Sequence, residues 1–254
     1  MYSITDEEIQ AQQAEYKKNY PPFYPFSLKD MDRWHIMRCF EVLLSTQNGQ
    51  DTDDYCVDDA NNKVRKYFGE AEKDSNRMLL LGTGTGREIL TAKDLGYDAV
   101  GNTFGSRNVY FGRHYLGLSE TEIFECAMES LPFEANTFDK IGGFQVFEHA
   151  MMPLQFLLEQ SRVLKDGGIL VLEWPPAKDY HGDDNPHHQI CFTPGQAKML
   201  FKKAGFVDIK LFYSDLEEIP EEDYWRADQN KMLCISGIKD PSFQPYINAI
   251  RNSR

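Results

Sequence analysis

Residues 78–86 read Met78-Leu79-Leu80-Leu81-Gly82-Thr83-Gly84-Thr85-Gly86, an apolar run that passes directly into alternating glycines. A short continuous apolar run ending in glycines is typical of a strand buried in a parallel sheet. Glycines let the backbone turn tightly and approach a ligand, and the start of a following helix offers unpaired N–H groups. The stretch therefore predicts a strand, a ligand-binding loop and a helix, in that order.

Two classes of cofactor use a glycine loop between a strand and a helix. A dinucleotide-binding loop has a glycine or alanine at the sixth position of GxGxxG and an acid about 20 residues further on. Here the sixth position is Arg87, and Asn102-Thr103 occupies the place of the acid. These two departures argue against a dinucleotide, and therefore against an NAD-linked oxidoreductase.

Strand and helix signals alternate from Arg77 onward. Further strands are predicted for residues 97–101, 122–126, 140–146, 169–172, 207–212 and 232–238. One predicted helix carries apolar side chains from Leu154 to Leu164 and stops at Lys165-Asp166-Gly167-Gly168, because glycine readily takes the left-handed conformation that ends a helix. Thr193 predicts the cap of another helix that begins with Pro194. The alternation predicts an α/β fold with a doubly wound, mostly parallel, seven-stranded Rossmann-like sheet.

The first part of the chain has a different pattern. Residues 20–26 contain three prolines and four aromatic residues, and residues 36–44 carry one apolar helical face. Residues 64–68 predict part of another short helix. We therefore divide the chain into an N-terminal helical and aromatic extension, residues 1–75, that serves as a lid or packing segment, and a sheet domain, residues 76–254.

Composition and charge limit the partners of this chain. Its 254 residues carry a net charge of -13, and they show no Lys/Arg block, so binding to a phosphate backbone is disfavoured. The sequence contains no run of about 18 apolar residues, so no membrane span is predicted. The N-terminus lacks the features of a signal peptide. The five cysteines are scattered without a CxxC pair, which favours a reducing, cytoplasmic location. A small-molecule, glycan or peptide substrate is expected, and the oligomeric state is left open.

Further stretches follow the glycine loop in a defined order. They are Met128-Glu129-Ser130-Leu131-Pro132-Phe133, Asn136-Thr137-Phe138-Asp139, Phe147-Glu148-His149 and Ser161-Arg162-Val163-Leu164-Lys165-Asp166-Gly167-Gly168-Ile169-Leu170. Together with the loop they resemble the motifs of class I S-adenosylmethionine-dependent methyltransferases, closest to the small-molecule-type branch, over about residues 77–239. The resemblance implies S-adenosylmethionine as cofactor and a strand order of 3-2-1-4-5-7-6 with the last strand antiparallel. It also places the cofactor across the carboxyl ends of the strands, as is general for open α/β sheets.

The resemblance also assigns cofactor-binding residues. The set that it implies is Gly82, Thr83, Gly84, Gly86, Thr103, Phe104, Met128, Glu129, Gly143 and Gln145. The glycine loop would approach the methionine and ribose parts, and Thr103 and Phe104 would face the ribose and adenine. Met128 would present its backbone N–H to the adenine ring. Gly143 and Gln145 would lie near the sulfonium end.

Three positions depart from the family pattern. Leu80, Thr103 and Ala127 stand where the family usually has acidic residues. Each missing carboxylate removes a charge-assisted hydrogen bond worth roughly 1.5 to 3 kcal/mol. Either threonine and backbone groups replace these contacts in a working methyltransferase, or the domain is a non-catalytic partner or scaffold. The intact glycine loop favours the enzyme.

Two histidines are candidates for the chemistry. Methyl transfer is an in-line displacement that needs a base only when the acceptor must lose a proton. His149 lies just past the fourth strand, and its alternative role is to pack against or cap the next helix. His188 ends a polar stretch, residues 181–188. Either this stretch is a solvated loop, or His188 faces the substrate. The spacing of this stretch fits no standard zinc site, so no metal is predicted.

Overall fold

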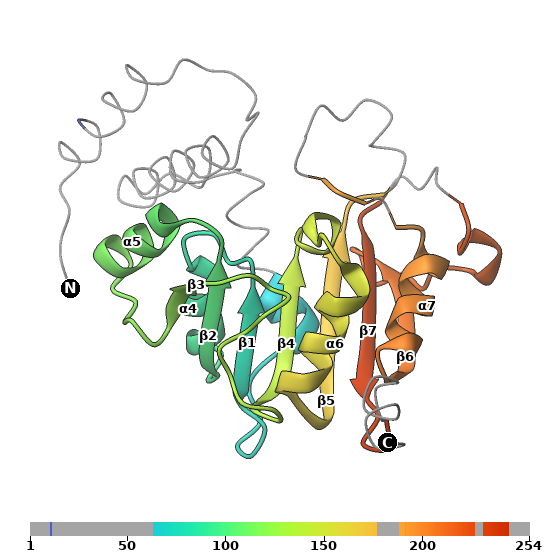
Figure 1. Cartoon of the computed structure of the whole chain (residues 1–254), viewed down its shortest axis with the longest axis horizontal. Helices are drawn as coiled ribbons and strands as arrows, with labels where there is room; N and C mark the ends of the chain where they lie inside the picture. Colours follow the sequence, from blue (N-terminus) through green and yellow to red (C-terminus); the bar gives the residue numbers. More distant parts are fainter. Residues whose placement is uncertain (1–10, 12–62, 177–187, 191, 227–230, 244–254) are drawn as a thin grey trace, which may run out of the picture.

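A computed structural model describes residue 11 and residues 63–176, 188–190, 192–226 and 231–243. Within these residues the strands form one sheet in the order β3-β2-β1-β4-β5-β7-β6, and Figure 1 shows them side by side with helices on both faces. This order confirms the doubly wound arrangement expected from the sequence.

The strands and helices alternate along the chain. The strands are β1 (Arg77–Leu81), β2 (Asp98–Thr103), β3 (Ile123–Glu125), β4 (Phe138–Phe144), β5 (Leu164–Trp174), β6 (Phe206–Tyr213) and β7 (Leu233–Lys239). The helices are α4 (Arg87–Asp94), α5 (Ser106–Tyr115), α6 (Pro153–Val163) and α7 (Pro194–Lys203), with short 3-10 turns η1 (Phe147–His149) and η3 (Glu221–Asp223). The strands from β3 to β5 pair in parallel, whereas β7 runs antiparallel to both β5 and β6. The carboxyl ends of β1 to β5 therefore meet at one edge of the sheet.

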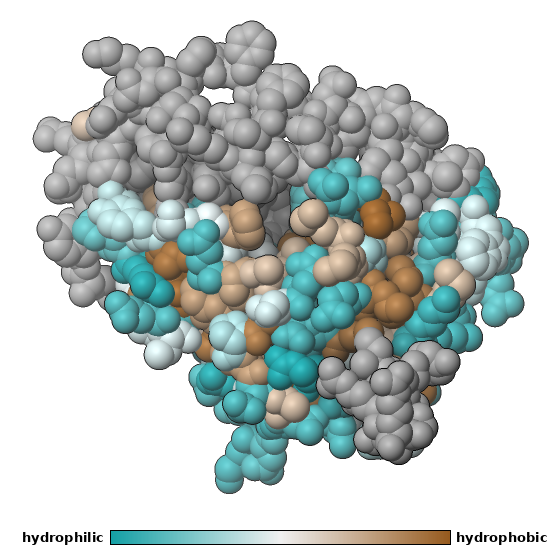
Figure 2. All heavy atoms as spheres, in the orientation of Figure 1, coloured by the Kyte–Doolittle hydropathy of each residue, from teal (hydrophilic) through white to brown (hydrophobic). Residues whose placement is uncertain are grey.

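The apolar run of β1 is buried on both faces because side chains alternate along a strand. Leu79 and Leu81 join the core cluster that contains residues of α6 and α7. Met78 and Leu80 join the opposite cluster, which contains residues of α4. Covering both faces explains why this strand is continuously hydrophobic. Figure 2 shows further hydrophobic residues at the surface between α6 and α7.

Helix α7 begins as its sequence predicts. Thr193 lies at the N-cap, its hydroxyl accepts a hydrogen bond from Gln196 N, and the Gln196 side chain accepts one from Thr193 N. This reciprocal capping box satisfies donors that the first turn leaves unpaired. Ala197 and Phe201 are fully buried, so this face of the helix packs into the core.

The predicted start of β5 is wrong. The helix ends at Val163, and β5 begins at Leu164 instead of at Ile169. Leu164 pairs with Phe138 of β4, and the register then shifts so that Ile169 pairs with Lys140. Gly167, with φ of 76°, lies inside this irregularity. The glycines thus shape a bulge inside the strand, because pairing with β4 already begins at Leu164.

Residues 63–68 are helical and pack against the sheet. Val64 is fully buried in the same core cluster as Leu80, and the Phe68 ring lies against Gly142 of β4, where a Cβ atom would come within 3.0 Å of it. The predicted short helix is therefore confirmed, while the domain boundary at residue 75 stays a prediction. The helix and aromatic segment expected within residues 12–62 lie outside the described residues. Among the described helices, none is long and apolar enough to cross a membrane.

Candidate functional site at the carboxyl edge of the sheet

The glycine loop joins β1 to α4 at the carboxyl edge of the sheet. Gly82, Gly84 and Gly86 have positive φ angles of 61°, 53° and 94°, which other residues rarely adopt. A Cβ atom on Gly82 would come within 2.3 Å of Val146 Cγ1, and one on Gly86 within 2.4 Å of Leu118 Cδ1. The glycines are therefore required by conformation, and at two positions by packing as well.

Asn102 of β2 links the glycine loop to the neighbouring strands. Its side-chain oxygen accepts a hydrogen bond from Gly82 N at 3.3 Å, and its Nδ2 donates to Cys126 O, just after β3, at 3.1 Å. Its main-chain oxygen accepts another from Thr83 N at 2.9 Å. Asn102 is 1% exposed, so water does not compete for these bonds. One buried amide thus holds together the carboxyl ends of three strands.

Two of the three positions where the family usually has acidic residues are buried in this chain. Leu80 is fully buried in an apolar cluster. Thr103 is 2% exposed, and its hydroxyl accepts a hydrogen bond from Asn108 Nδ2 at 3.4 Å. Ala127 is exposed. By contrast, the predicted neighbour Phe104 is 58% exposed, so its ring is the accessible group beyond β2.

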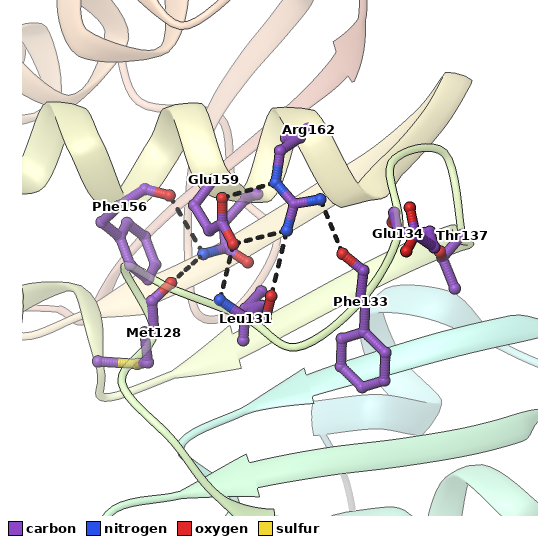
Figure 3. Close-up of polar contacts among 9 residues, drawn as sticks. Met128, Leu131, Phe133, Glu134, Thr137, Phe156, Glu159 and Arg162 are labelled. Atoms are coloured by element: carbon purple, nitrogen blue, oxygen red, sulfur yellow. Dashed lines mark hydrogen bonds and ion pairs between the residues drawn. The ribbon is translucent and has the colours of Figure 1, made fainter.

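The loop that contains Met128 is clamped to helix α6 (Figure 3). Gln160 Nε2 donates to Met128 O at 2.8 Å, and Glu159 Oε1 accepts from Leu131 N at 2.7 Å. Arg162 donates to Leu131 O at 3.2 Å and, through its other terminal nitrogen, to Phe133 O at 2.7 Å. These bonds fix the main chain that the adenine contact is predicted to use.

The clamp contains an ion pair between Glu159 and Arg162 of 2.7 Å. Burial opposes the ionisation of Glu159, but hydrogen bonds from Arg162 and from Leu131 N outweigh it and hold the pKa of this carboxyl below its ordinary value. Glu129, predicted in the cofactor set, directly follows Met128 in the same loop. Its carboxylate accepts from Met151 N at 3.1 Å, which joins the loop to the segment before α6.

The residue that follows β4 is strained. Gln145 has a φ of 57°, a left-handed conformation that costs free energy in a non-glycine residue. Gln145 is half-buried, whereas Val146, Phe147 and Glu148 after it are buried. Gly143 is packed tightly, since a Cβ atom there would lie 2.8 Å from Val146 Cγ2. Gln145 is therefore the side chain that β4 presents at the edge.

The two predicted histidines are brought together by the fold. The rings of His149 and His188 lie 4.9 Å apart, centroid to centroid, at an interplanar angle of 67°. Both are half-buried beside the buried Glu148, whose Oε1 lies 3.9 Å from His149 Nε2. Gln189 N and Ile190 N donate to Glu148 O at 2.8 and 3.2 Å, which anchors the segment that carries His188. Residues 181–187, the rest of the predicted polar stretch, lie outside the described residues.

The histidine cluster has two chemical uses. One ligand atom from each of Glu148, His149 and His188 lies within 4.8 Å of the others. An imidazole is a common proton acceptor in catalysis, and two imidazoles with a carboxylate also suit a divalent transition metal. The sequence predicted no metal because the spacing within residues 181–188 fits no standard zinc site, and that expectation stays a prediction.

A second buried carboxylate lies beside Gln145. Glu173, near the end of β5, is fully buried, and its Oε1 lies 2.7 Å from Lys63 Nζ. Tyr67 donates its hydroxyl to Glu173 Oε2 at 2.6 Å. Burial, then the neighbouring Cys234 and Glu173, raise the pKa of Tyr67, so this phenol remains a donor.

Sequence reasoning missed the residues that support the site. They are Lys63, Tyr67, Asn102, Glu159, Gln160, Arg162 and Glu173. The signal that was available is charge or amide character inside apolar segments, because polar groups in such places must find partners. The identity of each partner depends on pairing between distant strands, which no local pattern reports.

Comparison with known proteins finds similarity to methyltransferases over part of the chain. A family model described as a methyltransferase domain matches residues 79–172. A Mycobacterium tuberculosis protein named as a probable S-adenosylmethionine-dependent methyltransferase is 30% identical over 94 residues, which are 35% of this chain and 34% of that protein. The chain therefore spans about a third of the length of these relatives.

Two further similarities differ in what they cover. A tRNA U34 carboxymethyltransferase of Marinobacter nauticus is 26% identical over 136 residues, which are 50% of this chain and 41% of that protein. Among solved structures, the methyltransferase in a complex with the Haloferax volcanii Trm112 methyltransferase activator aligns with a TM-score of 0.60 and 16% identity, covering 82% of this chain and 97% of that one. At this identity the structural likeness establishes the fold.

Proposed function

We propose that this chain, whose residues 79–172 match a methyltransferase-domain model, is a class I methyltransferase that transfers a methyl group from S-adenosylmethionine to a small-molecule, glycan or peptide acceptor. The observation that carries the proposal is the meeting of His149 and His188 at the edge where the glycine loop ends β1. A donor site and a proton-accepting pair then share one edge of the sheet.

Donor binding is assigned to the predicted residues as the fold arranges them. The glycine loop gives close main-chain approach to the methionine and ribose parts, Phe104 offers an exposed ring, and the clamped loop offers the Met128 N–H to adenine. Gln145 would stand at the sulfonium end. Main-chain groups and an aromatic face thus replace the carboxylates absent at Leu80, Thr103 and Ala127.

The acceptor is proposed to lie over the histidine pair. An acceptor hydroxyl or amine loses a proton as its lone pair attacks the methyl carbon, the sulfur–carbon bond breaks, and S-adenosylhomocysteine leaves. His149 or His188 takes the proton, and the buried Glu148 carboxylate stabilises the imidazolium that forms. The exposed Met151 and Met152 next to this pair supply an apolar rim.

The proposed acceptor class and location rest on composition. A net charge of -13 repels nucleic acid backbones, so we place the acceptor among small molecules, glycans and peptides. The described cysteines, Cys126 and Cys234, are free thiols, consistent with the cytoplasmic location that we infer from the scattered cysteines of the sequence.

The alternative proposal is a non-catalytic partner or scaffold. It is favoured by the burial of Leu80 and Thr103, which closes two of the usual acid positions to the cofactor. Calorimetric titration with S-adenosylmethionine and S-adenosylhomocysteine separates the two functions. An active enzyme should bind both ligands. If neither ligand gives heat or a thermal shift at millimolar concentration, the scaffold function is favoured.

A methyl-transfer assay tests the role of the histidines. With hydroxyl, amine and RNA acceptors offered in parallel, we expect turnover on one of the first two, lowered about 100-fold or more in His149→Ala or His188→Ala. His114→Ala is the matched control, because His114 is exposed on α5, which follows β2, and it stacks on Tyr110. Turnover on RNA alone would contradict the proposed acceptor class.

A further inference from the structure

Glu173 is a carboxylate with no access to water at the edge where the proposed methyl donor binds. It is 0% exposed, and it lies one residue before the end of β5. A buried charge is costly unless a counter-charge and hydrogen-bond donors compensate it. Its surroundings therefore have to be built for it.

The segment before β1 supplies most of the compensation. Lys63 places its Nζ 2.7 Å from Glu173 Oε1, and Tyr67 donates its hydroxyl to Oε2 at 2.6 Å. Lys63 and Tyr67 are four positions apart in the helical residues 63–68, so they share one face of that helix. Cys234 of β7 lies 3.8 Å from the same carboxylate. The charge of Glu173 is thus compensated mainly by Lys63 and Tyr67, which precede the sheet domain.

Gln145 is held by Glu173 at two points. Gln145 N donates to Glu173 O at 2.9 Å, and Gln145 Nε2 donates to Glu173 Oε1 at 3.2 Å. A carboxylate accepts hydrogen bonds but cannot donate them, so the carboxamide must turn its NH₂ group to Glu173. Its carbonyl oxygen consequently faces away from Glu173. The left-handed φ of Gln145, 57°, is maintained by the same contacts.

We propose that Glu173 is a positioning residue for methyl transfer, which holds the carbonyl oxygen of Gln145 toward the sulfonium group of the donor. This inference rests on the proposed function. The sulfonium carries a positive charge and a polarised methyl group, both of which a carbonyl dipole attracts, whereas the thioether of the product has neither. The oriented carbonyl therefore favours the donor over the product, and Lys63 and Tyr67 make the N-terminal extension part of the site.

The test is a comparison of donor and product affinity in the full chain. Glu173→Gln replaces an acceptor by an amide that also donates, so the Gln145 carboxamide loses its fixed orientation. We expect the affinity for S-adenosylmethionine to fall about tenfold, the strength of one contact to a charged group, while the affinity for S-adenosylhomocysteine changes less than about twofold. Gln145→Leu should give the same selective loss, and the double variant should add little to it.

Two further variants separate positioning from folding. Lys63→Met combined with Glu173→Gln removes both buried charges, so no unpaired lysine remains to unfold the protein, and the selective loss should persist. Asp139→Asn is the matched control: Asp139 pairs with Lys165 at 2.9 Å at the start of β4, at the far end of the strand from Gln145. It should leave the ratio of the two affinities unchanged.

The outcomes distinguish this inference from the proposed function. Wild-type protein that binds neither ligand overturns both. Wild-type protein that binds both ligands, with Glu173→Gln lowering the two affinities equally, keeps the methyltransferase and reduces Glu173 to a structural role.

Discussion

Replacing Arg162 by alanine should loosen the loop that is proposed to hold adenine. The side chain donates to Phe133 O at 2.7 Å and to Leu131 O at 3.2 Å, and it pairs with Glu159 at 2.7 Å. Bonds to a charged donor contribute about 1.5–3 kcal/mol each, but 38% of the Arg162 side chain is exposed, so screening reduces them to about 1 kcal/mol each. With a similar discount for the ion pair, the free energy of unfolding should fall by about 2–3 kcal/mol.

Thermal unfolding and calorimetry together measure this effect. For a protein of this size the loss corresponds to a fall in Tm of about 5–10 °C. The freed loop must also be ordered again when ligand binds, so the affinity for S-adenosylmethionine should fall about tenfold.

Arg113→Ala is the matched control for this prediction. Arg113 also donates to main-chain oxygens, those of Ile123 at 2.9 Å and Glu120 at 3.4 Å, but it holds the start of β3 instead of the loop after it. It should lower Tm without changing the affinity. If Arg162→Ala lowers Tm as expected and leaves the affinity unchanged, the clamp does not serve the cofactor; if Tm falls by less than about 2 °C, the energetic reasoning is wrong.

Three more predictions concern pH, the buried amide and the glycine loop. Burial opposes the ionisation of Glu122, but hydrogen bonds from Lys93 and Ser119 outweigh it and lower the pKa of this carboxyl from 4.5 to about 2. The stabilisation by Glu122 is therefore complete above about pH 4.5 and is lost as the pH falls toward 2. Glu122→Gln should flatten acid unfolding in that window when it is followed by circular dichroism. Asn102→Ala should cost about 2 kcal/mol in urea unfolding, because Gly82 N and Cys126 O lose their partner; a cost below about 0.5 kcal/mol would show that water replaces the amide. Gly86→Ala should lower the free energy of unfolding by about 3 kcal/mol in the same measurement, because Gly86 has a φ of 94° and the added Cβ atom would lie 2.4 Å from a neighbouring methyl group. An unchanged urea midpoint would disprove the packing argument.

Local pattern predicted the elements well where each signal is completed within a few residues. The cap at Thr193 formed as expected because all of its partners lie within one turn. The strand start predicted at Ile169 failed for a long-range reason. Leu164 already pairs with Phe138 of β4, so tertiary contact decided where β5 begins.

The residues of the candidate site also fall into those that a local pattern predicts and those that only long-range contacts place. The glycine loop was readable in advance, since a strand, positive φ angles and a helix start are properties of neighbouring residues. Thr103 was singled out by its position alone, and the fold buries it against Asn108. The strand register placed Asn102, one residue earlier, where its amide reaches two other strands.

The amino-acid sequence by itself determined the order of strands and helices, the glycine loop and the class of domain, because periodicity, capping and backbone conformation act over a few residues. Only the tertiary structure decided that His149 meets His188 and that Glu173 is buried against Gln145 and the preceding helix. Such contacts join residues far apart in the chain. Their geometry follows from how strands pair and helices pack, and burial then sets which charges must be compensated.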